Sequence, residues 1–434
     1  MRVVPVFALT VLFSCGSSTQ VTYEKDVRPL MEARCTSCHA EGGIAPFALT
    51  SYEQVAAMKE AVAHAVKHRT MPPYLAAPGC AEYADDQNLT DEQIAMLQTF
   101  ASTGAPRGTV TKAASSTTAT LETSLPRVDL TLAMPVRYTP VGDPDDYRCF
   151  VIDWPHQTDT YVTGFNVKPG NARVVHHAIA FLIPPERLDP VLALDAADPA
   201  PGYPCYGGPG GNQTTVSWVG SWAPGVAANM YPADTGLLVR PGSKIVLQMH
   251  YNTTAAATAA ERVDLTSVEL ALADTVKRKA VIMPWANPDW IRKQKMNIPA
   301  GAADVRHSFQ FDPTGFLGTI SGGVLRSNEA VRIHSAGLHQ HLLGTGGRVE
   351  VLRADGSNEC LIDLPRWDFH WQRSYRMATP KTLRVGDQLK LSCSWNNSDA
   401  FQPVVNGQRS PPRNVNWGEG TGDEMCLGIL YVSE

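Results

Sequence analysis

The chain has 434 residues, 44% of them hydrophobic and 18% charged, with a formal net charge of −5. This length exceeds what one ordinary hydrophobic core serves, so we expect two or three domains. The slightly acidic balance gives no reason to expect nucleic acid or an anionic membrane surface as a partner. No stretch approaches the roughly 20 apolar residues of a membrane-spanning helix, and the 34 glycines and 32 prolines favour a turn-rich β protein.

Residues 1–20 predict export. Arg2 precedes an apolar run, residues 3–13, and small residues follow it, which is the pattern of a short signal peptide. The segment Leu12-Phe13-Ser14-Cys15 resembles a bacterial lipobox, which would leave Cys15 lipidated as a membrane anchor in the periplasm or at the cell surface. The alternative is a plain signal peptide with an incidental cysteine. Both interpretations place the protein outside the cytoplasm.

Residues 21–108 are predicted to form a small all-α domain. Ser51 and Gln54 can form a capping box, and apolar residues at helical spacing follow as far as Val66. This helix must end before Pro72, because proline excludes the helical conformation from the residue ahead of it. A second helix is expected to start at Thr90, with Gln93 as its capping-box partner, and to end near Gly104. Its buried face is expected to carry Ile94, Leu97 and Phe100.

The segment Cys35-Thr36-Ser37-Cys38-His39 within this domain is the c-type heme attachment pattern. Both thiols would bond to the heme and His39 would ligate its iron, so we predict one covalently bound heme c. Met71 is the expected sixth ligand, because a thioether opposite histidine raises the potential of an electron carrier. The rival ligands are His64 and His68. The rival interpretations of the motif are a redox-active Cys-x-x-Cys and a zinc knuckle.

A Thr-, Ser- and Ala-rich linker, residues 109–126, precedes a region of short β-type runs. Two blocks of similar size follow, residues 127–277 and 278–434, here named the first and second β blocks. We predict two tandem antiparallel β-sandwich domains. The expected strands include residues 150–152, 161–163, 174–182, 244–251, 267–272, 348–352, 388–393 and 425–432.

Six cysteines remain after Cys15, Cys35 and Cys38 are assigned. An even number of cysteines in an oxidising compartment predicts disulfides, although the sequence allows many pairings. They are Cys80, Cys149, Cys205, Cys360, Cys393 and Cys426.

Two histidines and one methionine of the second block have the residue types of a copper site. On a strand, His339 and His341 would point to the same face and chelate one ion. Met425 follows a polar turn, where a core methionine would be odd, and its thioether suits Cu(I). These three residues, here named the methionine site, would leave positions open for dioxygen.

Three histidines of the first block could form a second site, here named the three-histidine site. His176 and His177 would point to opposite faces of a regular strand, so binding one ion would require a β-bulge or different ring nitrogens. His250 would complete the site, and Gln248 faces the same side as His250. Gln248 could help connect the two sites, and the alternative is a simple hydrogen-bonding strand residue. A structural zinc ion is the alternative at this site.

The order and spacing of these six ligands resemble those of the copper type II, ascorbate-dependent monooxygenases, the family of peptidylglycine α-hydroxylating and dopamine β-monooxygenases. The resemblance covers about residues 127–434 and includes the supporting segments 367–372 and 386–387. It implies two eight-stranded, jelly-roll-like domains, each holding one copper ion. It also implies disulfides between Cys393 and Cys426 and between Cys149 and Cys205, and leaves Cys80 and Cys360 unassigned.

The resemblance implies that the methionine site holds the copper that activates O2, which makes His339, His341 and Met425 the catalytic residues. The three-histidine site would hold the copper that stores and delivers the second electron. The implied reaction is hydroxylation of a C–H bond of a small organic substrate, with ascorbate or a redox protein as electron donor.

Two departures from the family pattern change these expectations. Peptide-hydroxylating members have an Arg two residues before the His-x-His pair, and an Asn and a Tyr two and four residues after the Met. Here these positions hold Gly337, Leu427 and Ile429, so we expect a neutral substrate. The fused heme domain is the other departure, and we expect it to pass electrons to the copper domains. The alternative function is a non-enzymatic, exported electron-transfer or copper-holding lipoprotein.

Overall fold

The computed structural model describes residues 20–434 except 42, 44, 85, 110–123, 143–144, 206–207, 212–216, 225, 227, 254–255, 257, 406–407 and 419–421. The predicted signal peptide, Cys15 and most of the predicted linker lie outside the described residues. Within the described part of the chain, every helix is too short or too polar to cross a membrane.

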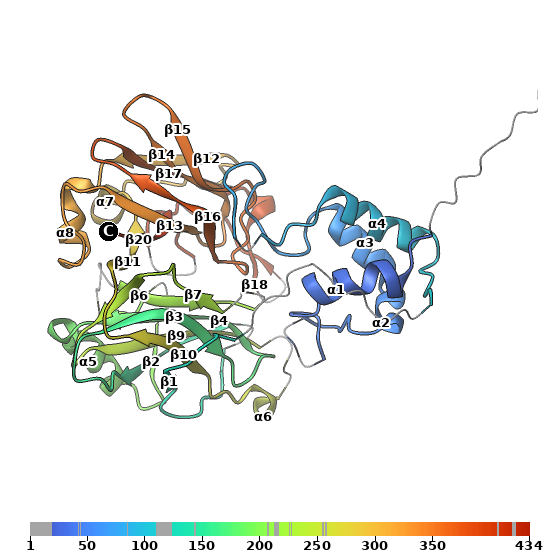
Figure 1. The fold of residues 1–434 in the computed structure, drawn as a ribbon, viewed down its shortest axis with the longest axis horizontal. Helices are drawn as coiled ribbons and strands as arrows, with labels where there is room; N and C mark the ends of the chain where they lie inside the picture. The colour runs from blue at the N-terminus through green and yellow to red at the C-terminus, as the bar shows by residue number, and fades with distance from the viewer. Residues whose placement is uncertain are drawn as a thin grey trace, which may run out of the picture.

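The described residues between 20 and 109 form a helical unit, drawn in blue in Figure 1. Its elements are η1 (Tyr23–Val27), α1 (Arg28–Arg34), α2 (Tyr52–Ala57), α3 (Lys59–Lys67) and α4 (Asp91–Ser102). Both predicted capping boxes are present, with the amide nitrogens of Gln54 and Gln93 donating to Ser51 and Thr90. The helix expected after Ser51 is interrupted at Met58, whose ψ of 9° lies outside the α region.

The helical unit has a hydrophobic core of its own. The apolar face of α4, with Ile94, Leu97 and Phe100, packs on residues of α1 such as Leu30 and Met31. Each of these α4 residues is at most 9% exposed, so the amphipathic pattern of the sequence identified the buried face correctly.

The two β blocks are mainly antiparallel, as predicted. The first block contains β1 (Leu130–Ala133), β2 (Asp145–Asp153), β3 (Thr160–Lys168), β4 (Val175–Ile183), β5 (Tyr203–Pro204), β6 (Ser217–Trp222), β7 (Asn229–Met230), β8 (Thr235–Val239), β9 (Lys244–Asn252) and β10 (Ser267–Ala273), with η2 (Pro185–Arg187), α5 (Asp189–Ala197) and α6 (Ala259–Arg262). The second contains β11 (Arg278–Trp285), β12 (Val305–Phe311), β13 (Val331–His339), β14 (Gly344–Leu352), β15 (Asn358–Leu364), β16 (Ser374–Leu383), β17 (Gln388–Trp395), β18 (Val404–Val405), β19 (Gln408–Arg409) and β20 (Leu427–Ser433), with α7 (Pro288–Lys293), η3 (Thr314–Phe316), α8 (Leu317–Ile320) and η4 (Asp399–Phe401).

One sheet runs through both blocks. Its order is β1-β10-β3-β8-β11-β20-β13-β16, with β7 beside β3. The first and second blocks meet at the pair β8–β11, which is parallel. A five-stranded sheet, β5-β2-β9-β4-β6, completes the sandwich of the first block, and a four-stranded sheet, β12-β17-β14-β15, completes that of the second. The two sandwiches are therefore joined by backbone hydrogen bonds as well as by the chain.

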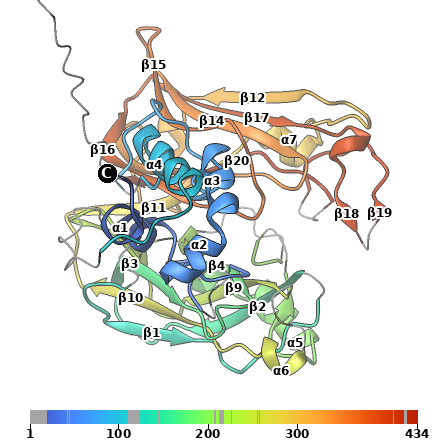
Figure 2. The ribbon, with the colours of Figure 1, turned by 90° about the vertical axis from the view of Figure 1, so that its right-hand side faces the viewer.

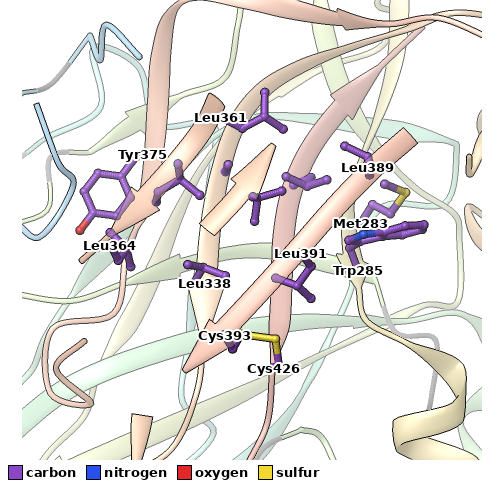
Figure 3. Packing of buried hydrophobic residues seen from close by; sticks show 14 of the residues in the cluster. Met283, Trp285, Leu338, Leu361, Leu364, Tyr375, Leu389, Leu391, Cys393 and Cys426 are labelled. Atoms are coloured by element: carbon purple, nitrogen blue, oxygen red, sulfur yellow. A yellow bond between two sulfur atoms is a disulfide. The ribbon is translucent and has the colours of Figure 1, made fainter. Parts of the chain in front are cut away.

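The core of each sandwich lies between its two sheets. In the second block, Leu338 of β13 and Leu391 of β17 are at most 2% exposed, and the disulfide between Cys393 and Cys426 lies beside them (Figure 3). Burial of one such leucine contributes roughly 1.5–3 kcal/mol to stability. The disulfide attaches the residue before β20 to β17. Met425 immediately precedes Cys426 in the sequence.

Three disulfides are present among the described residues. They include both pairs that the family resemblance implies, Cys149 with Cys205 and Cys393 with Cys426. The third joins Cys80 to Cys360, which the sequence left unassigned.

The third disulfide attaches the helical unit to the second β block. Cys80 lies between α3 and α4, in a segment that leaves the helices and runs along β15 and β16 (Figure 1). There the amides of Leu75, Ala77 and Ala84 donate hydrogen bonds to this block. The helical unit consequently lies in front of both β blocks, as Figure 2 shows. The segment between α3 and α4, which was predicted as part of the α domain, thus packs against the β sandwich of the second block.

Candidate metal centres

A β-bulge in β4 brings the neighbouring histidines of the first block to the same side. The pairing of β4 with β9 shifts register between Val175 and His177, which places the extra residue at His176. The Nδ1 atom of His177 then lies 3.5 Å from Nδ1 of His176 and 3.1 Å from Nδ1 of His250. The sequence predicted that the two neighbouring histidines could bind one ion only through a β-bulge or through different ring nitrogens. The structure has the bulge, so different ring nitrogens are not needed.

The spacing of these three nitrogens fits one metal ion. Two nitrogens bound tetrahedrally at roughly 2.0–2.1 Å from an ion are about 3.3 Å apart. The Nε2 atom of His250 lies 2.8 Å from a carboxylate oxygen of Asp145, so Nε2 carries the proton and Nδ1 keeps its electron pair for a metal. The ring of Tyr147 stacks on His250 with centroids 4.2 Å apart and holds its plane.

Burial keeps these imidazoles neutral at pH 7. It lowers the pKa of His176 to about 4, with a further contribution from nearby His370. Burial also lowers the pKa values of His177 and His250 well below their ordinary value. A neutral imidazole offers an electron pair, so all three side chains are in the protonation state that a metal requires.

The histidines of the second block are brought together at the end of a strand. The predicted chelate on one regular strand is wrong in detail, because β13 ends at His339 and His341 lies beyond it. The two rings are nevertheless 5.1 Å apart between centroids and nearly perpendicular. The ring of His341 is therefore oriented by the turn after β13 and not by the geometry of a strand.

Hydrogen bonds fix both rings of this pair in one tautomer. Nδ1 of His339 lies 2.5 Å from the side-chain oxygen of Gln372, and Nδ1 of His341 lies 3.0 Å from the carbonyl oxygen of Asp423. Both acceptors require a proton on Nδ1, which leaves the electron pair on Nε2. Nε2 of His339 is buried and has no hydrogen-bond partner among the described residues. A bound metal would satisfy this buried atom.

Met425 is held near this pair by the residue before it. β20 pairs with β13 as far as Leu427, which lies opposite His339, and Met425 comes two residues before this pair. The buried carboxylate of Glu424 accepts hydrogen bonds from the backbone nitrogens of His341, at 2.8 Å, and Leu343, at 2.6 Å. Met425 itself is only 5% exposed, so it is buried and does not lie in an exposed polar turn.

Both sites open into one cavity between the two β blocks. Its lining includes His177 and His339. Phe369 also lines it and lies between the sites, with its ring centroid 6.5 Å from that of His250 and 6.3 Å from that of His341. The sequence identified Phe369 only as part of a supporting segment, because nothing local shows that it faces both sites.

The cavity wall is mostly apolar. Leu427 and Ile429, two of the positions that depart from the peptide-hydroxylating pattern, are part of it, together with Trp218 and Trp222. Gln248 lines the cavity as well, while its amide donates to the carbonyl oxygen of Gly208 at 3.1 Å. Gln248 is therefore the hydrogen-bonding strand residue that the sequence allowed. Arg373 lines the cavity too, so the mostly apolar wall also carries one cationic residue.

The Cys-x-x-Cys-His segment forms the turn after α1. Cys35 and Cys38 are not joined by a disulfide, and burial raises the pKa of the Cys35 thiol to about 12. A reactive redox cysteine needs the opposite shift. Nδ1 of His39 lies 3.1 Å from the carbonyl oxygen of Phe47, which leaves Nε2 for a metal. Cys35, Cys38 and His39 are the residues that would hold a covalently attached heme.

The expected axial methionine lies in the loop after α3. Met71 is 36% exposed, and the next two residues, Pro72 and Pro73, line a cavity together with Cys38. The rival ligands are exposed and lie against each other, with the ring centroids of His64 and His68 4.2 Å apart and the rings tilted by 36°. Their mutual contact is that of helix-surface residues.

A comparison with protein families agrees with the second β block. Residues 325–433 match the family described as copper type II ascorbate-dependent monooxygenase, C-terminal domain. The matched segment contains His339, His341 and Met425. It also contains the disulfide between Cys393 and Cys426. The second block is thus similar to the C-terminal domain of copper-dependent oxidoreductases.

Proposed function

We propose that this protein is an exported copper monooxygenase that hydroxylates a C–H bond of a neutral small organic substrate. The observation that carries the proposal is the shared cavity, because one metal-binding set from each β block contributes a histidine to its wall. The similarity of residues 325–433 to a copper monooxygenase domain supports the same reaction class.

The two sites differ in the ligands that they offer to copper. Two imidazole nitrogens and a soft thioether suit Cu(I) at the methionine site, and three imidazole nitrogens suit copper at the other. Bound copper would supply one-electron redox chemistry and an open position for O2. Gln372 and Asp423 keep the two rings of the methionine site in the ligating tautomer, and the apolar wall excludes water and orients the substrate. Each turnover consumes O2, two electrons and two protons, and yields the hydroxylated product and water.

We also propose that a heme c bound at Cys35, Cys38 and His39, with Met71 as axial ligand, relays electrons from a redox protein or an ascorbate-like donor. Export is supported by the three disulfides, because disulfides form in oxidising compartments. We further propose a lipid anchor at Cys15, on the basis of the lipobox pattern in the sequence. Labelled palmitate should be incorporated into the full chain and lost in Cys15→Ser. Incorporation that persists in the variant would contradict the anchor.

A non-enzymatic copper or electron carrier would not need the cavity that links the sites. Metal analysis of the purified protein should find two copper ions and one heme. Met425→Leu should abolish O2 uptake coupled to product, while the heme spectrum and the copper of the three-histidine site stay intact. Met283→Leu, a buried methionine in the core of the same block, is the matched control and should keep activity. Full activity in Met425→Leu, or copper-loaded protein without O2 uptake for any substrate, would overturn the assignment.

The relay has its own test. His39→Ala should stop turnover with a protein electron donor and leave activity with ascorbate, since ascorbate can reduce copper directly. Equal loss with both donors would count against the relay.

A further inference from the structure

A second cavity lies where the three parts of the protein meet. Its lining includes Cys38 of the helical unit, Val226 of the first β block, and Trp371 and Gln372 of the second. Cys38 belongs to the heme attachment motif. The cavity therefore places one side of that motif next to the segment between β15 and β16.

Trp371 and Gln372 lead from this cavity to both copper sites. The ring of Trp371 lies 6.2 Å, between centroids, from the ring of His176 at the three-histidine site. The next residue, Gln372, is hydrogen-bonded to His339 of the methionine site at 2.5 Å. Trp371 and Gln372 are neighbours in the chain, so one peptide bond links a residue in contact with the three-histidine site to a residue bonded to the methionine site. Both residues also line the cavity that Cys38 lines.

The second β block holds the helical unit in this position. The disulfide between Cys80 and Cys360 crosses the junction, and a guanidinium nitrogen of Arg366 donates to the carbonyl oxygen of Arg69 at 2.8 Å. Both attachments lie close in sequence to the segment that carries Trp371. The approach of Cys38 to Trp371 is therefore fixed by covalent and hydrogen-bonded contacts.

We propose that electrons pass from the helical unit to the copper sites through Trp371 and Gln372, a route that rests on the proposed function of the heme. In each step one electron leaves the ferrous heme iron, which becomes ferric, and reduces one copper(II) to copper(I). Two steps supply the two electrons of one hydroxylation, and an external reductant, a redox protein or ascorbate, restores the ferrous heme. Electron transfer is faster through bonded and packed atoms than through solvent, which favours this segment.

The route is tested by single-turnover electron transfer, without substrate or O2. Protein loaded with heme and copper(II) is photoreduced at the heme under anaerobic conditions. Heme reoxidation is followed by absorbance, and loss of the copper(II) signal by EPR. In Trp371→Leu the rate of heme reoxidation should fall by about tenfold or more, and Trp371→Phe, which keeps an aromatic ring, should recover most of it.

Two controls separate the route from folding and from the proposed function. Ascorbate should reduce copper in Trp371→Leu at the wild-type rate, and copper content and the copper(II) EPR spectrum should be unchanged. Trp218→Leu changes a tryptophan that lines the cavity between the copper sites, and it should leave heme reoxidation unchanged. Wild-type heme reoxidation in Trp371→Leu overturns the route and leaves the relay standing. A wild-type protein whose heme never reduces copper overturns both, while the assignment of the methionine site still depends on the Met425→Leu experiment.

Discussion

The hydrogen bond from His339 to Gln372 should set the copper affinity of the methionine site. The side-chain oxygen of Gln372 accepts from Nδ1 of His339 at 2.5 Å, while the amide nitrogen of Gln372 donates to the carbonyl oxygen of Phe369 at 2.9 Å. The second contact fixes which end of the amide faces His339. Gln372→Leu removes both interactions and keeps a side chain of similar size.

Two effects of this substitution act in the same direction. Without the acceptor, the proton of His339 can move to Nε2, the nitrogen that must ligate the metal. Burial lowers the pKa of His339 and the Gln372 hydrogen bond raises it, so the substitution also makes the imidazole a weaker base. Loss of such a supporting partner costs about 10–100-fold in metal affinity, which corresponds to about 1.4–2.8 kcal/mol.

The measurement is a competition titration of Cu(I) against a coloured chelator. Gln372→Leu should weaken the methionine site by that factor and leave the three-histidine site unchanged. Gln248→Leu is the matched control, because Gln248 lines the same cavity but is hydrogen-bonded to Gly208. Unchanged affinity in Gln372→Leu, or an equal loss in both variants, would refute the reasoning.

Three further predictions concern the cross-link, the pH response and the other site. Replacing Cys80 and Cys360 by serine removes a cross-link between residues 280 apart in the sequence. The loss should lower the free energy of unfolding by about 2–4 kcal/mol and make the chain between α3 and α4 sensitive to limited proteolysis. An unchanged digestion pattern would contradict this prediction. The pKa of His176 is about 4 in the folded protein and 6.5 without burial, so the unfolded chain binds more protons between these values. In copper-free protein this group should contribute up to roughly 3 kcal/mol to the stability lost as the pH falls from 6.5 to 4, measured by urea unfolding. His176→Gln should remove that share and make the profile less steep, while His177 and His250, whose pKa values are also lowered, keep their own shares. Asp145→Ala should weaken copper binding at the three-histidine site by about tenfold and spare the methionine site; an equal effect on both sites would point to misfolding instead.

The sequence by itself determined the features that depend on near neighbours. The capping boxes at Ser51 and Thr90 and the buried face of α4 follow from residues within one or two helical turns, so pattern alone located them. The strands of the β blocks followed from short apolar runs in the same way. The ligand types at the two metal sites and the heme attachment pattern were readable because each motif spans only a few residues.

Tertiary structure decided everything that joins distant segments. The register of β4 on β9 places the bulge at His176, and that register depends on a strand some 70 residues away. The pairing of Cys80 with Cys360 and the parallel contact of β8 with β11 likewise depend on which surfaces pack together. In the sequence, Phe369, Trp371 and Gln372 stand out only as part of the segment 367–372 that supports the family resemblance. Only the packing of three separate units shows that this loop lies between both metal sites and the heme motif.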